Sequence, residues 1–350
     1  MKRVAVVGTV GLPACYGGFE TLVENLTKNA SSNISYSVFC SSKSYDVRKS
    51  EHNKASLEYL PLSANGIQSI PYDILSFMKC WMIKPDVTLV LGVSGCVFLP
   101  IYKLFSKSKI ITNIDGLEWK RGKWHPFAKR FLKLSEAIAV RYSDVVICDN
   151  QAIGDYVTSE YNTSNVVIAY GGDHVLPKNP DPVEKEKFYF SVCRIEPENS
   201  VDMVLEAFSK TSKQLKFVGN WDASDFGIQL KIKYEKNPNI EIIDPIYDVD
   251  ELYKLRQACK GYLHGHSAGG TNPSLVEAMH FGMPILAFDC KFNRYSTENQ
   301  ALYFNSSESL VYLLSEDDTS SFMCVGPRML DIAERKYNWK IISEAYEKLY

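Results

Sequence analysis

The chain has 350 residues, of which 45% are hydrophobic and 23% charged, an ordinary composition for a folded protein long enough to form two α/β domains. Its formal net charge of −2 gives no global attraction to nucleic acid, so any basic site must be local. The nine cysteines include no Cys-x-x-Cys pair, which argues against a disulfide framework and a structural zinc site. The N-terminal apolar run is too short for a signal peptide and predicts a first strand.

Strand-like and helix-like segments alternate along the first half of the chain. Strands are expected at 4–7, 36–40, 87–92, 109–113, 145–148 and 165–169, and helices are expected to begin at Phe19 and Pro126. This alternation is typical of a parallel sheet with helices on both sides. Residues 87–105 come nearest to a membrane span, but Gly92 and Pro100 favour a buried strand followed by a helix start.

The alternation pauses near Tyr170 and resumes at residue 188. Residues 174–187 are rich in Pro, Asp, Lys and Glu, which indicates a linker. Beyond it, strands are expected at 188–192, 215–218, 240–243 and 261–264, and helices at 201–211 and 249–258. The predicted fold is therefore α/β, with two Rossmann-like, doubly wound parallel-sheet domains at residues 1–172 and 173–330 that face a cleft. An amphipathic helix predicted at 331–350 is expected to pack back on the first domain.

The segment HSAGGTNPSLVEAM, residues 266–279, predicts a glycine loop that leads from a strand into a helix. Asn272 is suited to the N-cap and Pro273 to the first helical position. A helix start beside two glycines attracts a phosphate through its backbone N–H groups. Glu277 lies one turn further, where its carboxylate can accept hydrogen bonds from ribose hydroxyls. The segment therefore points to a nucleotide sugar.

The first predicted strand leads into GTVGLPACYGGFE, residues 8–20, which lacks the Gly-x-Gly-x-x-Gly spacing of dinucleotide sites. The second strand ends in Cys40 and Ser41, where a dinucleotide site needs an acidic residue for the ribose. Both features argue against a nicotinamide dehydrogenase. What remains is a long, mobile loop that ends in Gly17-Gly18 at a helix start, suited to close over a phosphate. A glycine turn without a ligand is an equal alternative.

Polar residues also follow the strands of the second half. Arg194 comes after the strand at 188–192, where a guanidinium faces the ligand crevice and suits a diphosphate; a salt bridge to a nearby glutamate is the alternative. Asn220 and Tyr247 are candidates for a base pocket, although Tyr247 is equally suited to core packing. His266 is expected near the donor sugar or as a structural histidine, since a metal site lacks a third ligand. The predicted donor site comprises Gly17, Gly18, Arg194, Asn199, Asn220, Tyr247, His266, Gly269, Gly270, Thr271, Asn272 and Glu277.

The segment NIDGLEW, residues 113–119, follows a strand and is expected to face an acceptor. Asp115 or Glu118 can orient or deprotonate an acceptor hydroxyl, which needs a carboxylate within hydrogen-bond reach. The alternative is that Asp115 shapes a turn and that Glu118 pairs with Lys120 or Arg121. Both interpretations stay open from the sequence.

Residues 119–133 hold six Lys or Arg and no acid, interleaved with two Trp and two Phe. This composition suits the anionic cytoplasmic leaflet of a membrane. Nucleic acid is the rival ligand, but no recognition module supports it. A solvated helix face with a buried apolar side is the remaining alternative. The predicted membrane or acceptor patch comprises Lys120, Arg121, Lys123, Trp124, Lys129, Arg130 and Lys133.

Five motifs together, GLPACYGGFETLVENL, NIDGLEWKRGKW, CDNQAIGDYV, RIEPEN and HSAGGTNPSLVEAM, resemble retaining glycosyltransferases of family 4, which have the GT-B fold. More narrowly, they look like bacterial β-1,4-rhamnosyltransferases of capsule and O-antigen synthesis, over nearly the whole chain. The resemblance implies transfer of L-rhamnose from dTDP-L-rhamnose to a polyprenyl-diphosphate-linked saccharide, capped by glucose, with no metal and no other cofactor. It also implies a cytoplasmic protein held peripherally on the inner face of the cell membrane.

The chain departs from the family pattern at three positions. Glu277 matches the second glutamate of the family's Glu-x7-Glu motif, but the first falls at Gly269, and the usual lysine falls at Asn199. Asp115 stands where related enzymes carry a histidine near the transferred sugar. These departures favour an altered donor choice. They leave open a protein that binds a nucleotide sugar without turnover, and a nucleotide-sugar 2-epimerase, also built on paired α/β domains, is a further alternative.

Overall fold

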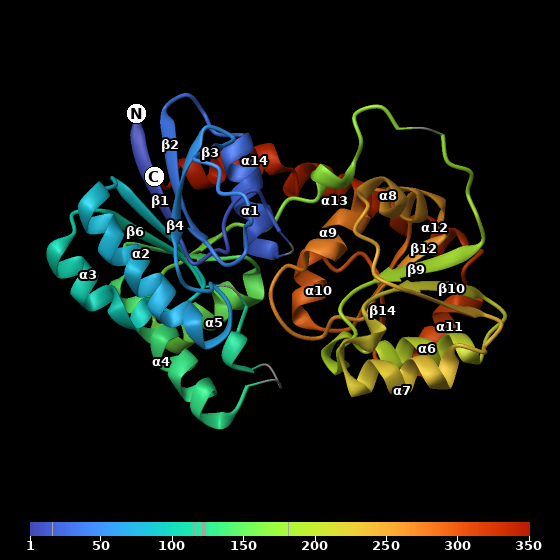
Figure 1. The fold of residues 1–350 in the computed structure, drawn as a ribbon. Coiled ribbons are helices and arrows are strands. Elements are labelled where there is room, and N and C mark those ends of the chain that lie inside the picture. The colour runs from blue at the N-terminus through green and yellow to red at the C-terminus, as the bar shows by residue number, and fades with distance from the viewer. Residues whose placement is uncertain (16, 115, 121–123, 181) are drawn as a thin grey trace. The chain divides into compact units, whose positions relative to one another are not determined.

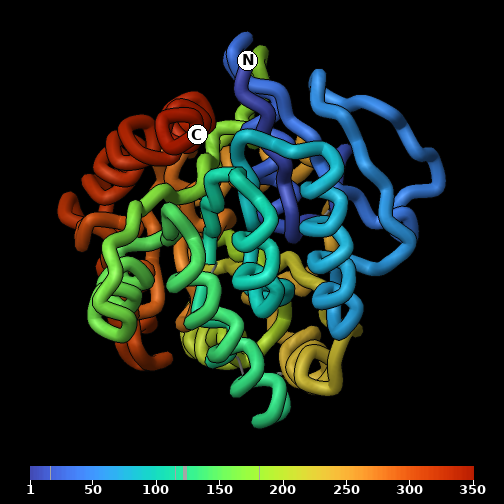
Figure 2. Tube along the Cα trace, turned by 90° about the vertical axis from the view of Figure 1, so that its left-hand side faces the viewer, coloured from blue at the N-terminus to red at the C-terminus, as the bar shows by residue number. Residues whose placement is uncertain are grey.

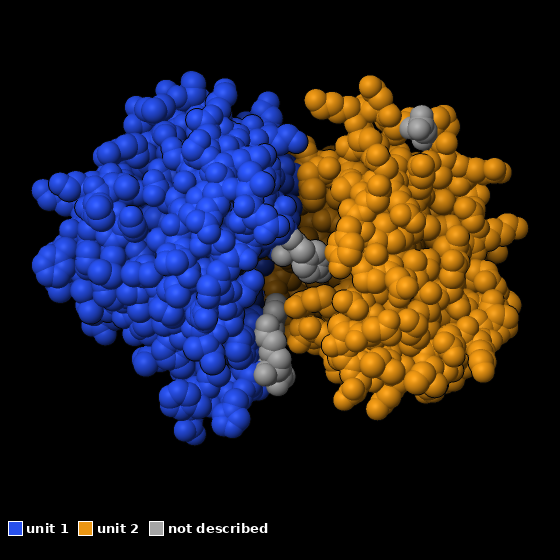
Figure 3. All heavy atoms as spheres, in the orientation of Figure 1, with its two compact units in different colours: residues 1–169, 339–350 blue, residues 170–338 orange. Residues whose placement is uncertain are grey.

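The computed structural model describes every residue of the chain except 16, 115, 121–123 and 181. The chain forms two compact units: unit 1 comprises residues 1–169 and 339–350, and unit 2 comprises residues 170–338 (Figure 3). The boundary thus lies at residue 169 rather than at the predicted residue 172. At the C-terminal end only residues 339–350 join unit 1, whereas residues 331–338 belong to unit 2.

Unit 1 contains an eight-stranded sheet with strand order β3-β4-β2-β1-β5-β6-β7-β8 (Figure 1). Its strands are β1 (Lys2–Val7), β2 (Ile34–Ser41), β3 (Glu51–His52), β4 (Ala55–Leu60), β5 (Val87–Leu91), β6 (Lys109–Asn113), β7 (Val145–Cys148) and β8 (Val166–Val167). Neighbouring strands are parallel, except that β3 and β4 form an antiparallel pair. The central strands are apolar and buried because helices cover both faces of the sheet.

The helices of unit 1 are α1 (Gly18–Lys28), α2 (Ser69–Ile83), α3 (Leu99–Phe105), α4 (Pro126–Tyr142), α5 (Gln151–Tyr161) and α14 (Trp339–Glu347), with short 3-10 turns η1 (Gly66–Gln68), η2 (Cys96–Phe98) and η3 (Glu118–Lys120). Helices α2 to α5 lie side by side in chain order on one face of the sheet (Figure 2). Helix α1 lies on the other face, where it packs against α14 (Figure 1). Right-handed crossovers produce this split, because the connection after β1 and those after β4 run in opposite directions along the sheet.

Helix α14 and the residues after it are bonded to the strands of unit 1. The Asn113 amide donates to the Tyr346 hydroxyl at 2.9 Å, and the hydroxyls of Tyr36 and Tyr350 lie 3.0 Å apart. The two ends of the chain are consequently close together (Figure 1). The predicted return to unit 1 is made by α14, while α13 (Val325–Lys336) stays in unit 2.

Unit 2 contains a six-stranded, fully parallel sheet with strand order β11-β10-β9-β12-β13-β14. Its strands are β9 (Phe188–Val192), β10 (Gln214–Val218), β11 (Ile240–Ile243), β12 (Gly261–His264), β13 (Ile285–Phe288) and β14 (Leu302–Phe304). Its other elements are η4 (Asp173–Val175), η5 (Pro197–Asn199), α6 (Val201–Ser209), η6 (Trp221–Ala223), α7 (Asp225–Tyr234), α8 (Val249–Ala258), α9 (Pro273–Met279), α10 (Lys291–Ser296), α11 (Ser307–Ser315), α12 (Ser320–Met323) and α13. Phe208, Phe217 and Trp221 belong to the core that joins α6 and η6 to the sheet.

The predicted class, with two doubly wound α/β parts, is confirmed. The apolar segment 87–105 forms β5, η2 and α3, in agreement with the strand and helix start expected there. Among the described residues, no helix combines the length and apolar character needed to cross a membrane.

Candidate functional site

Each sheet has one point at which the chain order reverses, and doubly wound folds bind their ligands beyond the strand ends at such switch points. The reversal lies between β1 and β5 in unit 1 and between β9 and β12 in unit 2. In unit 2 the strands lead into residues 193–200 and 265–272, which contain most of the predicted donor-site residues. In unit 1 β1 leads into the loop that ends at Gly17.

Hydrogen bonds join the two switch-point loops of unit 2. Ser267 donates through its backbone N, at 2.9 Å, and its hydroxyl, at 2.8 Å, to the carbonyl of Glu198. The Asn199 amide nitrogen donates to the Arg194 carbonyl at 2.7 Å, and the Asn199 amide oxygen lies 2.6 Å from Nδ1 of His266. Because that oxygen can only accept, Nδ1 of His266 carries the proton. Buried Asn199 therefore holds His266 in place.

Gly269 adopts a backbone conformation that glycine favours, with φ of +115°. A Cβ at this position would lie 2.9 Å from Nε2 of His266. The glutamate that the resemblance places here would therefore need a strained backbone and a displaced imidazole. The departure from the family motif at position 269 thus has a local cause, since His266 occupies the adjacent space.

Glu277, on α9, lies between an arginine and a histidine. Its Oε2 is 2.5 Å from Nη2 of Arg256 on α8, and its Oε1 is 3.5 Å from Nε2 of His174 in η4. The side chain of Arg256 is 4% exposed and that of Glu277 is 15% exposed, so the pair is poorly hydrated. An unpaired charge would be costly there. The pair fixes the Glu277 carboxylate as a hydrogen-bond acceptor that a ligand can still reach.

Neither His174 nor Arg256 was predicted from the sequence. His174 lies in the segment assigned to the linker, although η4 packs against α9 so closely that a Cβ on Gly172 would lie 2.6 Å from the Val276 carbonyl oxygen. The adjacent glycines were the available signal, because glycine allows such an approach. Burial lowers the pKa of His174 and outweighs the opposing effect of Glu277. The imidazole is therefore neutral at neutral pH.

The other predicted donor residues of unit 2 are more exposed. Arg194 lies 3.7 Å from Glu196 and 3.9 Å from Glu198, and 43% of its side chain is exposed. The salt bridges considered as the alternative are thus present, but long, exposed pairs hold a guanidinium weakly. Asn220 is exposed, and Tyr247 is 75% exposed, so Tyr247 does not pack in the core.

The start of α9 has the predicted local structure. Asn272 is its N-cap, and the side-chain oxygen accepts from the backbone N of Ser274 at 3.0 Å and from the Ser274 hydroxyl at 2.8 Å. Pro273 is the first helical residue. The preceding Thr271 is buried and Gly270 is half-buried. This confirms the predicted capping of the helix that carries Glu277.

In unit 1, the loop after β1 is anchored by Glu20 of α1. This buried carboxylate accepts from the backbone N of Val10 at 2.8 Å and from the Thr9 hydroxyl at 3.0 Å. A Cβ on Gly17 would lie 1.8 Å from Oε2 of Glu20. Gly17, which precedes Gly18 at the helix start, is therefore needed to make room for the anchoring carboxylate.

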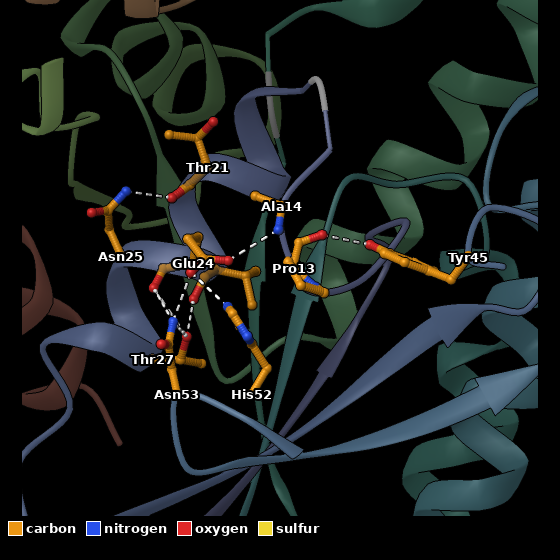
Figure 4. Close-up of polar contacts among 10 residues, drawn as sticks. Pro13, Ala14, Thr21, Glu24, Asn25, Thr27, Tyr45, His52 and Asn53 are labelled. Atoms are coloured by element: carbon orange, nitrogen blue, oxygen red, sulfur yellow. Dashed lines mark hydrogen bonds and ion pairs between the residues drawn. The ribbon is translucent and has the colours of Figure 1, made fainter. Parts of the chain in front are cut away.

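Glu24, one turn along α1, fixes the middle of the same loop (Figure 4). It accepts from the backbone N of Ala14 at 3.0 Å, from Asn53 at 2.8 Å, and lies 2.7 Å from Nε2 of His52. Burial raises the pKa of Glu24, but these hydrogen bonds outweigh burial and lower it overall. The described part of the loop is thus anchored at several points, in contrast to the mobile loop expected from its glycines.

The two predicted acceptor-side residues have different outcomes. Asp115 lies outside the described residues. Glu118 is in η3, shortly after β6, where its Oε1 accepts from the indole nitrogen of Trp124 at 2.9 Å. This bond fixes the half-buried Glu118 carboxylate beyond the carboxyl end of a central strand.

Lys133, assigned to the membrane patch, points into an aromatic cluster instead. Its Nζ lies 4.8 Å from the ring centroid of Trp119, 4.7 Å from that of Tyr156 and 2.8 Å from the Glu160 carboxylate. Buried Glu136 completes the cluster by accepting from Tyr156 at 2.7 Å and from Trp119 at 3.1 Å. The Lys133 ammonium is therefore bonded within the unit, and its place in the membrane or acceptor patch stays a prediction.

The remaining patch residues are distributed unevenly. Lys120 lies over the ring of Trp119, with Nζ 5.2 Å from the centroid. Lys129 is half-buried and Arg130 is exposed. Arg121 and Lys123 lie outside the described residues. Of the described cations of this patch, Lys120 and Arg130 are exposed.

No group of three His, Cys, Asp or Glu side chains within the described ranges is arranged to hold a metal ion. The rings of His264 and His266 lie 6.0 Å apart. Burial, with a smaller effect of His266, lowers the pKa of His264 well below its ordinary value. His264 is therefore a neutral, buried residue behind the loop.

Two family descriptions match consecutive parts of the chain. Residues 1–173 match "Domain of unknown function (DUF1972)", and residues 175–308 match "Glycosyl transferases group 1". The division between these matches falls close to that between the structural units.

An uncharacterized glycosyltransferase of Haemophilus influenzae is 23% identical over 194 residues, which are 53% of this chain and 54% of that protein. The chain thus matches about half the length of this relative. Sucrose-phosphate synthase from Thermosynechococcus elongatus has a TM-score of 0.80 at 13% identity, covering 100% of this chain and 98% of that one. HepE of Anabaena in complex with UDP has a TM-score of 0.78 at 13% identity, covering 99% of both. These likenesses confirm the predicted GT-B fold. Residues 175–308 thus match the glycosyl transferases group 1 description, within a chain whose two units have the domain architecture of the GT-B fold.

Proposed function

We propose that the protein is a glycosyltransferase that takes its sugar from a nucleoside diphosphate. The observation that carries the proposal is the Glu277 carboxylate, which lies inside the group 1 match, is paired with Arg256 and has His174 beside it. Such a fixed acceptor suits a hydroxyl of the nucleotide's pentose, the 3′-hydroxyl in the case of dTDP, because it needs no reorganisation when the ligand binds. Exposed Arg194, held only by long ion pairs, is available to a diphosphate. The UDP in the HepE complex supports a nucleotide ligand for this fold.

For the sugar, we infer L-rhamnose carried by dTDP, on the strength of the motif resemblance. A 6-deoxy sugar has one hydroxyl fewer to satisfy, which agrees with the absence of a glutamate at Gly269. With retention of configuration, the leaving diphosphate takes the acceptor proton, so the protein mainly positions the reactants and stabilises charge. No metal or other cofactor enters this proposal.

For the acceptor, we infer a glucose-capped saccharide on polyprenyl diphosphate, at the inner face of the cell membrane. Glu118 lies beyond β6 in unit 1, and with Asp115 it is the candidate to orient the acceptor hydroxyl. This part of the proposal rests on the resemblance and on the position of residues 113–120 after a central strand.

The direct test incubates the protein with a panel of nucleotide sugars and synthetic lipid-diphosphate monosaccharides, and identifies products by mass and linkage. We expect rhamnose to be transferred to the glucose-capped acceptor. Isomerised donor formed without any acceptor would instead identify an epimerase. Saturable donor binding without transfer or hydrolysis would identify a non-catalytic binding protein. Either result would reject the proposal.

A second test replaces the carboxylate without removing the partner of Arg256. The change Glu277→Gln keeps an amide oxygen beside the arginine but weakens the hydrogen bond to the pentose hydroxyl of the donor, so the KM for the donor should rise about tenfold or more. The matched control is Glu308→Gln, whose carboxylate is 75% exposed on α11. Equal donor KM values for both variants would contradict the role of Glu277.

A further inference from the structure

The helices α2 and α3 of unit 1 expose large apolar side chains in regular stripes. On α2, Met78 is 45% and Met82 is 74% exposed. On α3, Ile101 is 47%, Leu104 78% and Phe105 74% exposed. The spacings of four residues on α2 and of three and four on α3 place each set on one side of its helix. Both helices therefore present an apolar stripe to solvent.

These two stripes belong to one surface. The Trp81 ring of α2 lies 5.8 Å from that of Phe105 and 6.1 Å from that of Tyr102, both on α3. The Trp81 indole also donates to the Tyr102 carbonyl at 3.4 Å. Figure 2 faces this side of unit 1 and shows α2, α3 and α4 side by side.

Helix α4 extends the surface with a mixed stripe. Phe127 is 78% and Leu134 is 57% exposed, and Arg130 and Arg141 are exposed on the same side of the helix. The separations of three, four and seven residues from Phe127 to Arg141 follow the helical repeat. The stripe thus combines apolar and cationic side chains.

The charge on these helices has one sign at the surface. Their cationic residues are Lys79, Lys103, Lys129, Arg130, Lys133 and Arg141. Their carboxylates are Asp73 and Glu136, which are 5% and 2% exposed. Asp73 accepts from the backbone N of Gly95 at 3.0 Å, and Glu136 accepts from the aromatic cluster. These helices therefore present cations but no exposed carboxylate.

We propose that this surface, the α2–α4 face, docks on an anionic lipid bilayer. We define it by Met78, Lys79, Met82, Ile101, Leu104, Phe105, Phe127, Arg130, Leu134 and Arg141. Long apolar side chains beside cations match a bilayer, which offers acyl chains below a layer of phosphates. The charge decides between occupants, because a second copy would bring cations against cations. Apolar patches of this kind on a protein surface commonly mark an interaction site.

The proposal deepens the proposed function, since a lipid-linked acceptor lies at such a bilayer. It also extends the contact beyond the stretch predicted from the sequence, of which Phe127 and Arg130 remain part. Lys133 of that stretch points into the unit, while α2 and α3 contribute residues that the sequence analysis did not select.

The first experiment measures sedimentation of the full chain with phosphatidylcholine vesicles that contain phosphatidylglycerol. The double variant Leu104→Ser, Phe105→Ser should bind at least about tenfold more weakly, because two apolar side chains no longer enter the bilayer. The matched control is Ile228→Ser, Ile232→Ser on α7 of unit 2, where the side chains are 39% and 67% exposed. The control should bind like the parent.

A second arm tests the charge. The double variant Lys79→Glu, Arg130→Glu should lose at least about fivefold in binding for each cation removed. Binding of the parent should weaken with added salt, and it should be much weaker on vesicles of phosphatidylcholine alone.

Unchanged vesicle binding by both face variants would overturn the proposal. So would a concentration-dependent dimer in light scattering that the Leu104 and Phe105 changes dissociate while vesicle binding persists, since the face would then belong to a second copy. Sedimentation uses neither donor nor acceptor, and each variant is also assayed for transfer to a water-soluble acceptor. If the parent protein transfers sugar but does not bind vesicles, only this inference is rejected. If it binds vesicles but transfers no sugar, only the proposed function is rejected.

Discussion

The loops at the two switch points of this protein have similar sequences, but the glutamate that follows each loop has different partners. In unit 1 Gly17-Gly18 is followed closely by Glu20, and in unit 2 Gly269-Gly270 is followed by Glu277. Glu20 accepts hydrogen bonds from the loop that precedes it, so its charge is satisfied by the fold. Glu277 is satisfied by the side chain of another helix, through Arg256.

The difference shows that a glutamate near paired glycines has no fixed role. A carboxylate bonded to the backbone of its own loop shapes that loop. A carboxylate that pairs with a cation through one oxygen keeps its remaining lone pairs available to a ligand. The Gly-Gly pattern marks close packing in both units, whereas the proposed ligand role belongs to Glu277 alone, and four experiments test this contrast.

The largest effect is expected from Arg256→Met. The change leaves the poorly hydrated Glu277 carboxylate without its cation, so the free energy of unfolding should fall by about 3 kcal/mol, measured by urea denaturation. Arg335→Met is the control, because Arg335 pairs with Glu298 at 2.8 Å on an exposed surface and should cost at most about 1 kcal/mol. Similar losses of unfolding free energy in the two variants would show that the Arg256–Glu277 pair contributes no more than an exposed ion pair.

A smaller loss is expected from Glu20→Ala in unit 1. The change removes the acceptor for the Val10 backbone and the Thr9 hydroxyl, which should cost about 2 kcal/mol of unfolding free energy. The variant Glu20→Gln keeps one acceptor oxygen and should lose less. If alanine is tolerated as well as glutamine, the loop is held by other contacts and the contrast with Glu277 fails.

The stabilities of the two units should respond to acid with opposite sign. Burial raises the pKa of Asp73 in unit 1 from 3.8 to about 8, despite the opposing bond from Gly95. Folded unit 1 therefore holds a proton that the unfolded chain lacks, and its stability should rise as pH falls from 8 towards 4. In unit 2, burial lowers the pKa values of His174 and His264 from 6.5, so the unfolded chain takes up protons first and stability should fall below pH 6.5.

Hydrogen exchange followed by mass spectrometry, corrected for the intrinsic effect of pH, measures each unit separately. Asp73→Asn should remove the rise in unit 1, and His264→Phe should reduce the fall in unit 2. The hydrogen bonds of Glu24 lower its pKa despite burial. Protonation of Glu24 should therefore lower the stability of unit 1 only below pH 4.5. Parallel responses of the two units would contradict the prediction.

The smallest change in stability is expected from Arg194→Ala. Its ion pairs are long and exposed, so unfolding free energy should change by less than about 0.5 kcal/mol. Donor binding should nevertheless weaken, because the diphosphate loses a cation. Calorimetry with dTDP gives the affinity. A stable variant with unchanged dTDP affinity would show that Arg194 does not bind the diphosphate.

The fold was largely predictable from the sequence, and the failures have physical causes. Strands β6 and β9 were placed correctly, and both faces of these strands are largely buried. Helix α2 was missed because Met78 and Met82 are apolar on its solvent side, which hides the helical periodicity. Strand β4, which lies between β2 and the edge strand β3, was also missed from the sequence.

The candidate site was predictable where its residues belong to one motif. Asn272 and Glu277 lie in the same loop and helix, so local spacing was sufficient. Arg256 and His174 reach Glu277 from α8 and η4, and such contacts depend on how the elements pack. Asn199 was predicted as a donor-site residue, but its hydrogen bond to His266 could not be predicted. That bond depends on the pairing of β9 with β12, which the sequence does not reveal.

The return of residues 339–350 to unit 1 has a consequence for how the protein is made. Unit 2 is continuous from 170 to 338, so a growing chain can complete it while synthesis continues. Unit 1 begins first and finishes last, because the side of α1 that packs on α14 stays uncovered until residue 350 has left the ribosome. We therefore expect nascent chains that end before residue 339 to recruit chaperones through the earlier unit, although most of its residues have already been synthesised.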